Sequence, residues 1–157
     1  MDDIGRLIAI EEIRKVKARY FRGLDEKNET LLRETFADDV ELDYRGSTTD
    51  PATGYNASQG VTEAIQRGGD HCAKLIANSL IGIVSVHHGS IGEIEITGED
   101  TASAIWPMVD RLRFGPNSPI AEMIGYGHYH ETYVRIDGKW RIKTLRLTRL
   151  RLDVISA

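Results

Sequence analysis

The sequence predicts an α+β fold, in which helices near the N-terminus pack on a curved, mostly antiparallel sheet. Two observations predict it. Apolar residues recur at three- and four-residue steps between Ile4 and Leu24, which is the period of an amphipathic helix. From about residue 84 onwards, apolar and polar residues alternate as they do in strands. Helices followed by strands favour a cone-shaped half-barrel with a central pocket between the helices and the concave face of the sheet.

Composition and charge limit the classes of function. The chain has 157 residues, of which 41% are hydrophobic and 28% are charged, so we expect one soluble domain with a real core. The net charge of −4 argues against general binding to nucleic acid or to a membrane surface. The only cysteine, Cys72, excludes an internal disulfide. The acidic N-terminal stretch has no long apolar run, so we expect neither a secretory signal nor a membrane span, and a cytoplasmic protein.

Four segments of the first half have helical patterns. The first helix begins with Asp3 as its N-cap, and Gly23 with the polar run after Leu24 indicates its end. The second is capped by Asn28. Residues 58–67 predict a further helix after a loop at 47–56, and residues 72–88 predict a helix that turns to strand near Val84.

The remaining segments alternate with period two and predict strands. A Gly/Pro-rich loop at 115–119 and a hairpin turn at 137–139 separate the last three of them. The predicted strands are residues 40–44, 91–97, 101–114, 125–136 and 139–152.

The stretch "RYFRGLD" places a phenol, Tyr20, and a carboxylate, Asp25, near the end of the first helix. In an ideal helix five residues advance by about 500°, which leaves these side chains about 140° apart. They share a face only if the helix ends between them, and the stop signals favour that ending. Taken alone, the fragment also suits a simple alternative, a solvated carboxylate at a helix end.

Other polar residues occur on faces that are otherwise apolar. His87 and His88 are adjacent, so only one of them can face the pocket of a strand. Asp110 shares a strand face with Trp106 and Met108, where an ionised carboxylate needs partners or a raised pKa. Arg149 is the candidate counter-charge, unless its side chain extends to solvent.

His128 and His130 share a strand face, and two imidazoles at that spacing can hold zinc or iron. The sequence offers no third ligand. Surface pairing or a subunit contact explains the two histidines equally well, so we expect no metal and no cofactor.

These residues and their spacing resemble the SnoaL-like branch of the nuclear-transport-factor-2-like superfamily, and within it the scytalone and bile acid 7α-dehydratases. The similarity runs nearly end to end and is strongest at "RYFRGLD", at residues 85–114 and at "IDGKWRI". It implies one SnoaL-like domain over residues 1–157 and a homotrimer or other small oligomer. The chain departs from these enzymes in an extra stretch, "GGDHCAKLIANS", and in Leu24, where scytalone dehydratase has a tyrosine.

Carried over by position, the resemblance implies an active site. The catalytic residues of the bile acid enzymes fall on Tyr20, Asp25, His87, Asp110 and Arg149. The substrate-facing tyrosine of scytalone dehydratase falls on Tyr44, and we expect the substrate also to contact Trp106, Met108 and Leu147.

The resemblance implies a cofactor-independent lyase that removes water from a hydroxylated cyclic or steroid-like ketone. A neutral imidazole, with a pKa of about 6.5, suits the general base, and Asp25 would fix its tautomer. Tyr20, with Tyr44, would donate to the developing oxyanion. Asp110 would either stay protonated and donate, or pair with Arg149. Isomerisation, cyclisation, dehydrohalogenation and simple binding of a small molecule are the alternatives.

Overall fold

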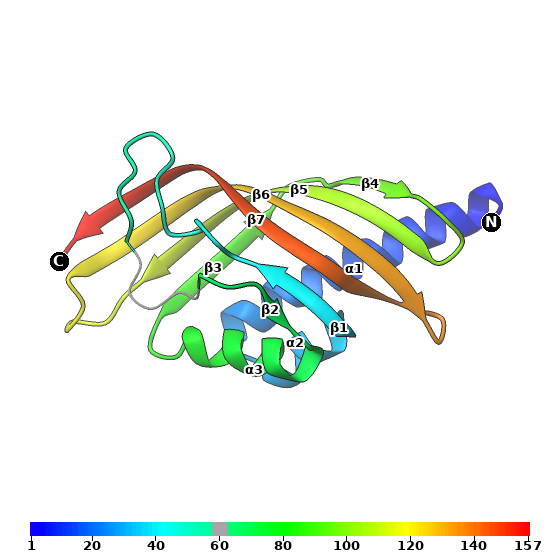
Figure 1. The fold of residues 1–157 in the computed structure, drawn as a ribbon, viewed down its shortest axis with the longest axis horizontal. Coiled ribbons are helices and arrows are strands. Elements are labelled where there is room, and N and C mark those ends of the chain that lie inside the picture. The colour runs from blue at the N-terminus through cyan, green and yellow to red at the C-terminus, as the bar shows by residue number, and fades with distance from the viewer. Residues whose placement is uncertain (58–62) are drawn as a thin grey trace.

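The computed structural model describes residues 1–57 and 63–157, which form three helices and a seven-stranded sheet (Figure 1). The helices are α1 (Asp3–Glu26), α2 (Glu29–Thr35) and α3 (Gly69–Ser79). The strands are β1 (Phe36–Asp43), β2 (Gln66–Arg67), β3 (Val84–Gly89), β4 (Glu93–Ile96), β5 (Thr101–Arg113), β6 (Ile120–Ile136) and β7 (Lys139–Ser156). The α+β class is confirmed, and so is the change from helix to strand near Val84.

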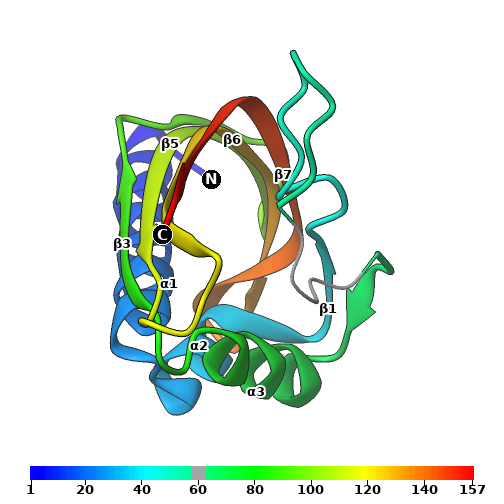
Figure 2. The same ribbon diagram turned by 90° about the vertical axis from the view of Figure 1, so that its left-hand side faces the viewer.

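The sheet is mixed and strongly curved. Its order is β2-β1-β7-β6-β5-β3, with β4 paired to β5. Only the β1–β7 pair is parallel among these described strands. Viewed end on, the long strands curl around the interior while α2 and α3 lie across its lower side (Figure 2). In the described part of the chain, no helix combines the length and apolar composition needed to cross a membrane.

Helix α1 differs from the expectation at both ends. Asp2, not Asp3, is the N-cap, because its carboxylate accepts the amide of Gly5 at 2.8 Å. The helix also continues through Asp25 and ends at Lys27, which adopts the left-handed conformation with φ of 54°. The expectation that the helix ends between Tyr20 and Asp25 is therefore wrong.

The helix predicted over residues 58–67 is not found in its described part. Residues 58–62 lie outside the described residues. Gln66 and Arg67 instead form β2, which pairs antiparallel with β1. Arg67 donates to Glu41 of β1 at 3.0 Å, so pairing at the sheet edge outweighs the helical pattern there.

A β-bulge in β7 determines which of its side chains face inwards. Gly127 of β6 pairs with Arg149 and Tyr126 pairs with Arg151, so Leu150 is the extra residue. The bulge shifts the alternation by one. Leu147 and Arg149 before the bulge and Leu152 after it are thereby directed to the interior, while Leu150 is exposed.

A substitution at Gly127 tests how closely the backbones of β6 and β7 approach each other at this bulge. A β-carbon at Gly127 would lie 1.9 Å from the carbonyl oxygen of Thr148, so the two backbones would have to separate. We expect Gly127→Ala to lower the free energy of unfolding by about 3 kcal/mol, the upper end of the usual cost of overpacking. Gly115→Ala, whose β-carbon meets nothing within 4 Å, is the control for urea denaturation. Equal midpoints for the two variants would contradict the close approach.

Candidate active site

A cavity of about 360 Å³ lies between the helices and the concave face of the sheet, a size typical of small-molecule sites. The polar groups that line it are the side chains of Tyr20, Tyr44, Ser47, Thr48, Gln66, Ser79, His87, Asp110, Tyr129 and Arg149. Its apolar lining comes from Leu24, Leu42, Ala57, Leu75, Ile76, Leu80, Ile83, Leu112, Phe114, Met123 and Leu147. Helix α3 is formed by the stretch "GGDHCAKLIANS", in which this chain departs from the enzymes it resembles. It contributes Leu75 and Ile76 to this apolar wall.

His87 and Asp25 form a hydrogen-bonded pair at the wall of this cavity. Asp25 Oδ1 lies 2.7 Å from His87 Nδ1, and Asp25 Oδ2 accepts the backbone amide of His87 at 2.9 Å. Because an ionised carboxylate only accepts, Nδ1 carries the proton and a neutral imidazole keeps its lone pair on Nε2. His88 is exposed, as expected for the neighbouring residue of a strand.

Asp25 is not itself part of the cavity lining, because α1 continues past it and turns it away from Tyr20. Its carboxylate lies behind the imidazole instead. Burial raises the pKa of Asp25, but the hydrogen bonds from the His87 ring and amide outweigh it and hold this pKa below its usual value. The carboxylate thus stays ionised where it can stabilise an imidazolium.

Three phenols, those of Tyr20, Tyr44 and Tyr129, line the cavity next to one another. The hydroxyl groups of Tyr20 and Tyr44 are 2.5 Å apart, and the ring of Tyr129 meets that of Tyr20 edge to face with centroids at 5.8 Å. Burial raises the pKa of each phenol above its ordinary value. They therefore remain protonated near neutral pH and can donate hydrogen bonds.

Asp110 and Arg149 form a bidentate ion pair across β5 and β7. Arg149 Nη1 and Nη2 donate to the two carboxylate oxygens at 2.6 and 2.9 Å, and Nε donates to the carbonyl of Ser47 at 2.7 Å. Both side chains are at most 5% exposed. Of the two roles left open for Asp110, the geometry supports the ion pair, and Arg149 does not extend to solvent.

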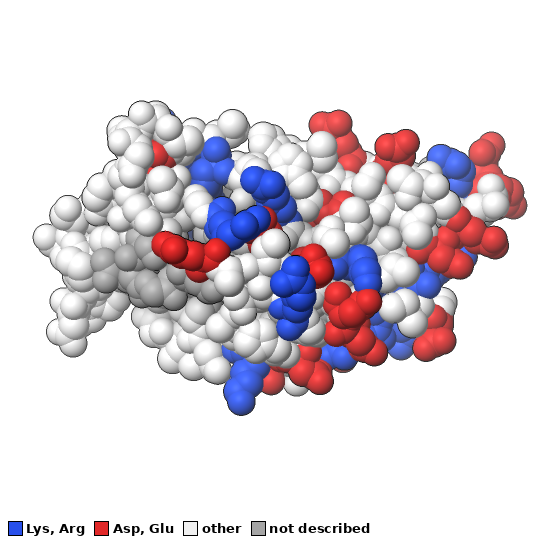
Figure 3. Space-filling model, in the orientation of Figure 1, with Lys and Arg blue, Asp and Glu red and all other residues white. Residues whose placement is uncertain are grey.

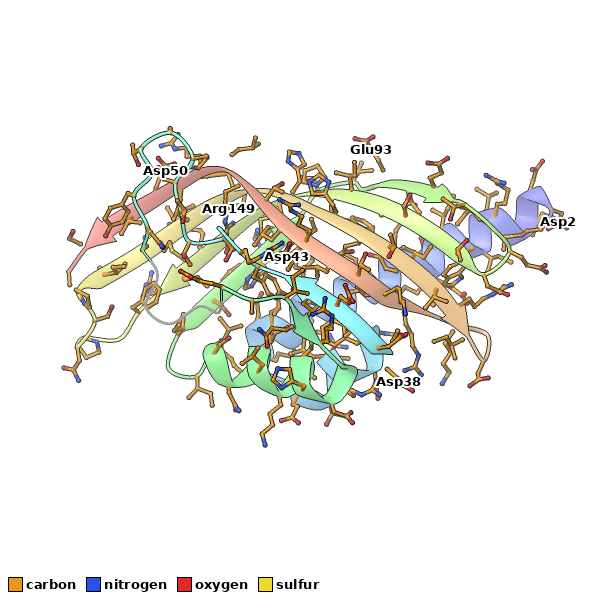
Figure 4. All side chains as sticks on the ribbon, in the orientation of Figure 1. Asp2, Asp38, Asp43, Asp50, Glu93 and Arg149 are labelled. Carbon is orange, nitrogen blue, oxygen red and sulfur yellow. The ribbon has the colours of Figure 1, made fainter. Side chains whose placement is uncertain are left out.

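The room for this ion pair comes from Gly125 on the intervening strand β6. A β-carbon at Gly125 would lie 2.2 Å from both Arg149 Nη1 and Asp110 Oδ1. Figure 4 shows Arg149 on β7 beneath the loop that carries Asp50. Asp50 accepts the amide of Leu152 at 3.1 Å, so both residues bind the loop to β7.

The structure corrects two of the expected substrate contacts. Leu147 and Tyr44 line the cavity, but Trp106 and Met108 do not. Trp106 packs against Gly92, where a β-carbon would lie 2.3 Å from its ring. Arg149 Nη1 lies 3.6 Å from the sulfur of Met108. Both residues are on the predicted strand face, but neighbouring groups cover them.

The two histidines tested for metal binding lie on the other face of the sheet from the cavity. The ring centroids of His128 and His130 are 6.3 Å apart, and His130 Nε2 is 3.0 Å from the hydroxyl of Thr148. Within residues 1–57 and 63–157, no group of three or more His, Cys, Asp or Glu side chains is arranged to hold a metal ion.

A second buried ion pair, Lys17 with Glu131, lies behind the phenols and was missed by the sequence reasoning. Lys17 Nζ is 2.5 Å from Glu131 Oε1, and both side chains are at most 2% exposed. Burial lowers the pKa of Lys17 to about 8, although Glu131 opposes that shift. The available signal was position, since Lys17 is four residues after Ile13 and three before Tyr20 on the buried stripe of the helix.

A curved mixed sheet with helices that close its concave side is the nuclear transport factor 2-like class of α+β fold. Within this class, the sequence matches the SnoaL-like domain over residues 5–146, and the chain belongs to that family.

Solved structures share the fold at low sequence identity. A putative scytalone dehydratase from Novosphingobium aromaticivorans is 21% identical, with a TM-score of 0.75 over 99% of this chain and 93% of that one. A hexachlorocyclohexane dehydrochlorinase, LinA type 2, is 18% identical, with a TM-score of 0.78 over 99% and 95%. A Kribbella flavida protein is 19% identical, with a TM-score of 0.73 over 91% of each chain. The family relation supports an enzyme that processes small molecules.

Removal of one partner tests the Asp110–Arg149 pair. Asp110→Asn leaves a buried guanidinium without its counter-charge, so we expect the free energy of unfolding to fall by about 3–5 kcal/mol. Asp110→Asn/Arg149→Met removes both charges and should recover most of this loss in a urea melt. A double variant no more stable than the single one would contradict the pairing.

The lowered pKa of Lys17 predicts a pH dependence of stability. Below about pH 8 Lys17 is protonated in both the folded and the unfolded chain. Between about pH 8 and 10.5 the folded chain has lost this proton, whereas the unfolded chain still keeps it. Stability therefore rises with pH across this window, by roughly 3 kcal/mol for about 2.5 pKa units. The difference in unfolding free energy between the wild type and Lys17→Met/Glu131→Gln measures this contribution. A difference that does not change across the window would refute the shift.

Proposed function

We propose that this chain is a cofactor-independent lyase that eliminates water from a hydroxylated cyclic ketone. One observation carries the proposal. The hydrogen-bonded pair of His87 and Asp25 and the hydrogen-bonded pair of Tyr20 and Tyr44 border the same largely apolar cavity. A base and oxyanion donors in one cavity are what an elimination next to a carbonyl requires.

In the proposed reaction, His87 Nε2 removes a proton from the carbon next to the carbonyl group. The electron pair of that C–H bond moves towards the carbonyl oxygen. One phenol of the Tyr20–Tyr44 pair donates its hydrogen to the other, and the second phenol donates a hydrogen bond to the developing negative charge. The enolate then forms the carbon–carbon double bond and expels the β-hydroxyl group. The imidazolium returns the proton to this leaving group, so the products are water and a conjugated ketone.

Asp25 and the second ion pair have supporting roles in this proposal. Asp25 keeps the proton of the imidazole on Nδ1 and stabilises the imidazolium by its charge. Asp110 and Arg149 neutralise each other and hold the loop at Ser47 against the cavity, so the substrate meets a shaped wall rather than a free charge. The apolar residues around the rest of the cavity favour a cyclic, steroid-like or polyketide-like carbon skeleton.

Dehydrohalogenation is the second candidate, because one solved structure of the same fold is a dehydrochlorinase. It starts with the same proton abstraction. It does not require an oxyanion donor, however, and the Tyr20–Tyr44 pair therefore favours a carbonyl substrate. The homotrimer implied by the resemblance and the cytoplasmic location expected from the N-terminal sequence stay predictions.

A panel of cyclic β-hydroxyketones, followed by the absorbance of the conjugated product, tests the reaction. We expect His87→Ala and Asp25→Asn each to lower turnover by about 10²–10⁴, the usual effect of removing a positioned base. The combined variant should lose little more, because the two side chains act as one unit.

His88→Ala is the matched control, because it removes an exposed imidazole from the same strand. It should leave turnover close to that of the wild type. If a folded His88→Ala protein lost more turnover than His87→Ala, the assignment of His87 as the base would be wrong. Chloride release from chlorinated analogues, with no turnover of any hydroxyketone, would favour the second candidate.

A further inference from the structure

Four buried side chains form a connected polar group behind the cavity wall. Trp106 Nε1 donates to the hydroxyl of Tyr133 at 3.1 Å, and that hydroxyl donates to Glu131 Oε2. The other carboxylate oxygen of Glu131 binds the ammonium of Lys17. None of these four side chains lines the cavity, so the proposed reaction does not use them directly.

The ammonium of Lys17 contacts three aromatic rings at once. Its nitrogen is 3.5 Å from the ring centroid of Tyr129, 4.4 Å from that of Tyr20 and 4.6 Å from that of Phe21. A cation at these distances attracts the electron-rich face of a ring, and the attraction is stronger where water is excluded.

These three rings contact both functional parts of the proposed site, the phenols that donate to the oxyanion and the imidazole that acts as the base. Tyr20 and Tyr129 line the cavity, and Tyr20 is bound to Tyr44. Phe21 stacks on the imidazole of His87, with centroids 6.4 Å apart and planes 17° apart. One buried charge thus contacts a proposed oxyanion donor and the ring that supports the proposed base.

Stability does not account for this ion pair. Two charges lose much of their hydration when buried, and apolar replacements of buried pairs are often as stable or more stable. The lowered pKa of Lys17 points the same way, because it shows that burial disfavours the charged ammonium. The position of the ammonium against the three rings remains as the reason for a lysine at this place.

We propose that Lys17 is a positioning residue, whose ammonium, held by Glu131, fixes the rings of Tyr20, Phe21 and Tyr129. The ring of Phe21 in turn sets the plane of His87. The catalytic part of this inference rests on the proposed function, whereas the fixing of the rings does not.

Three variants separate this role from a general effect on folding. Lys17→Met alone leaves the Glu131 carboxylate buried without a counter-charge and can unfold the chain. Lys17→Met/Glu131→Gln removes both charges and keeps an acceptor for Tyr133. Lys15→Met is the matched control, since it removes an exposed lysine from the same helix.

The first measurement needs no ligand. With isotope-labelled tyrosine, NMR reports the rate at which each ring flips. We expect the rings of Tyr20 and Tyr129 to flip faster in the double variant, while the exposed ring of Tyr55 and every ring in Lys15→Met behave as in the wild type. Unchanged flipping of Tyr20 and Tyr129 in a folded double variant would overturn the proposal.

The same spectra of the wild type decide the question even if the double variant fails to fold. Lys17 loses its charge around pH 8, so Tyr20 and Tyr129 should begin to flip faster between about pH 7 and 9.5. The titratable groups in contact with the Lys17–Glu131 pair are the phenols of Tyr20, Tyr129 and Tyr133. Burial keeps the pKa of all three phenols well above this range. Flipping rates that stay constant over this range would also overturn the proposal.

Turnover provides the catalytic test. In the folded double variant we expect kcat for a cyclic β-hydroxyketone to fall by about 10²-fold, the cost of small misplacement, with little change in KM. A wild-type kcat in that variant would overturn the catalytic part. If the wild type itself converts no hydroxyketone, the proposed function fails, and the ring measurements still decide whether Lys17 fixes the rings.

Discussion

The ion pair between Asp110 and Arg149 is the interaction on which the cavity depends. It joins β5 to β7 across β6, and its third donor binds the loop at Ser47. A charge buried this deeply is tolerated only with a partner, so each residue requires the other. Because the cavity lies between this pair, the helices and the loop, its shape follows from the pair.

The charged side chains of the molecule are unevenly distributed around this cavity. Figure 3 shows them concentrated over the middle and one end of the displayed face, while the end that carries the C-terminus has few. Apolar residues such as Leu112, Phe114 and Met123, which line the cavity, lie near that end of the sheet. An apolar ligand would thus meet few charges there before it reached the buried polar groups.

Periodicity alone predicted much of the fold. The apolar stripe of α1 placed Tyr20 inside, and strand alternation placed Asp110 and Arg149 inside. The inward position of His87 rather than His88 came from the resemblance. Periodicity could not predict the bulge at Leu150, because a bulge breaks the alternation from which strand faces are inferred.

The sequence also could not show which buried side chains reach the cavity. Trp106 and Met108 share a face with Asp110, but contacts from other segments cover them. The sequence reasoning missed Lys17, because lysines are rarely buried and because its partner Glu131 is far away in the chain. Asp25 was placed beside Tyr20, whereas the helix continues and sets it behind His87.

Gly125 limits the order in which substitutions can accumulate at this site during evolution. While Asp110 and Arg149 are present, any side chain at position 125 collides with both of them. Once the ion pair is lost, the glycine is free to be replaced, and the larger residue then blocks the return of the pair. The loss of this ion pair would therefore be hard to reverse in evolution. A related protein with a larger residue in place of Gly125 would have to shape its cavity by other contacts.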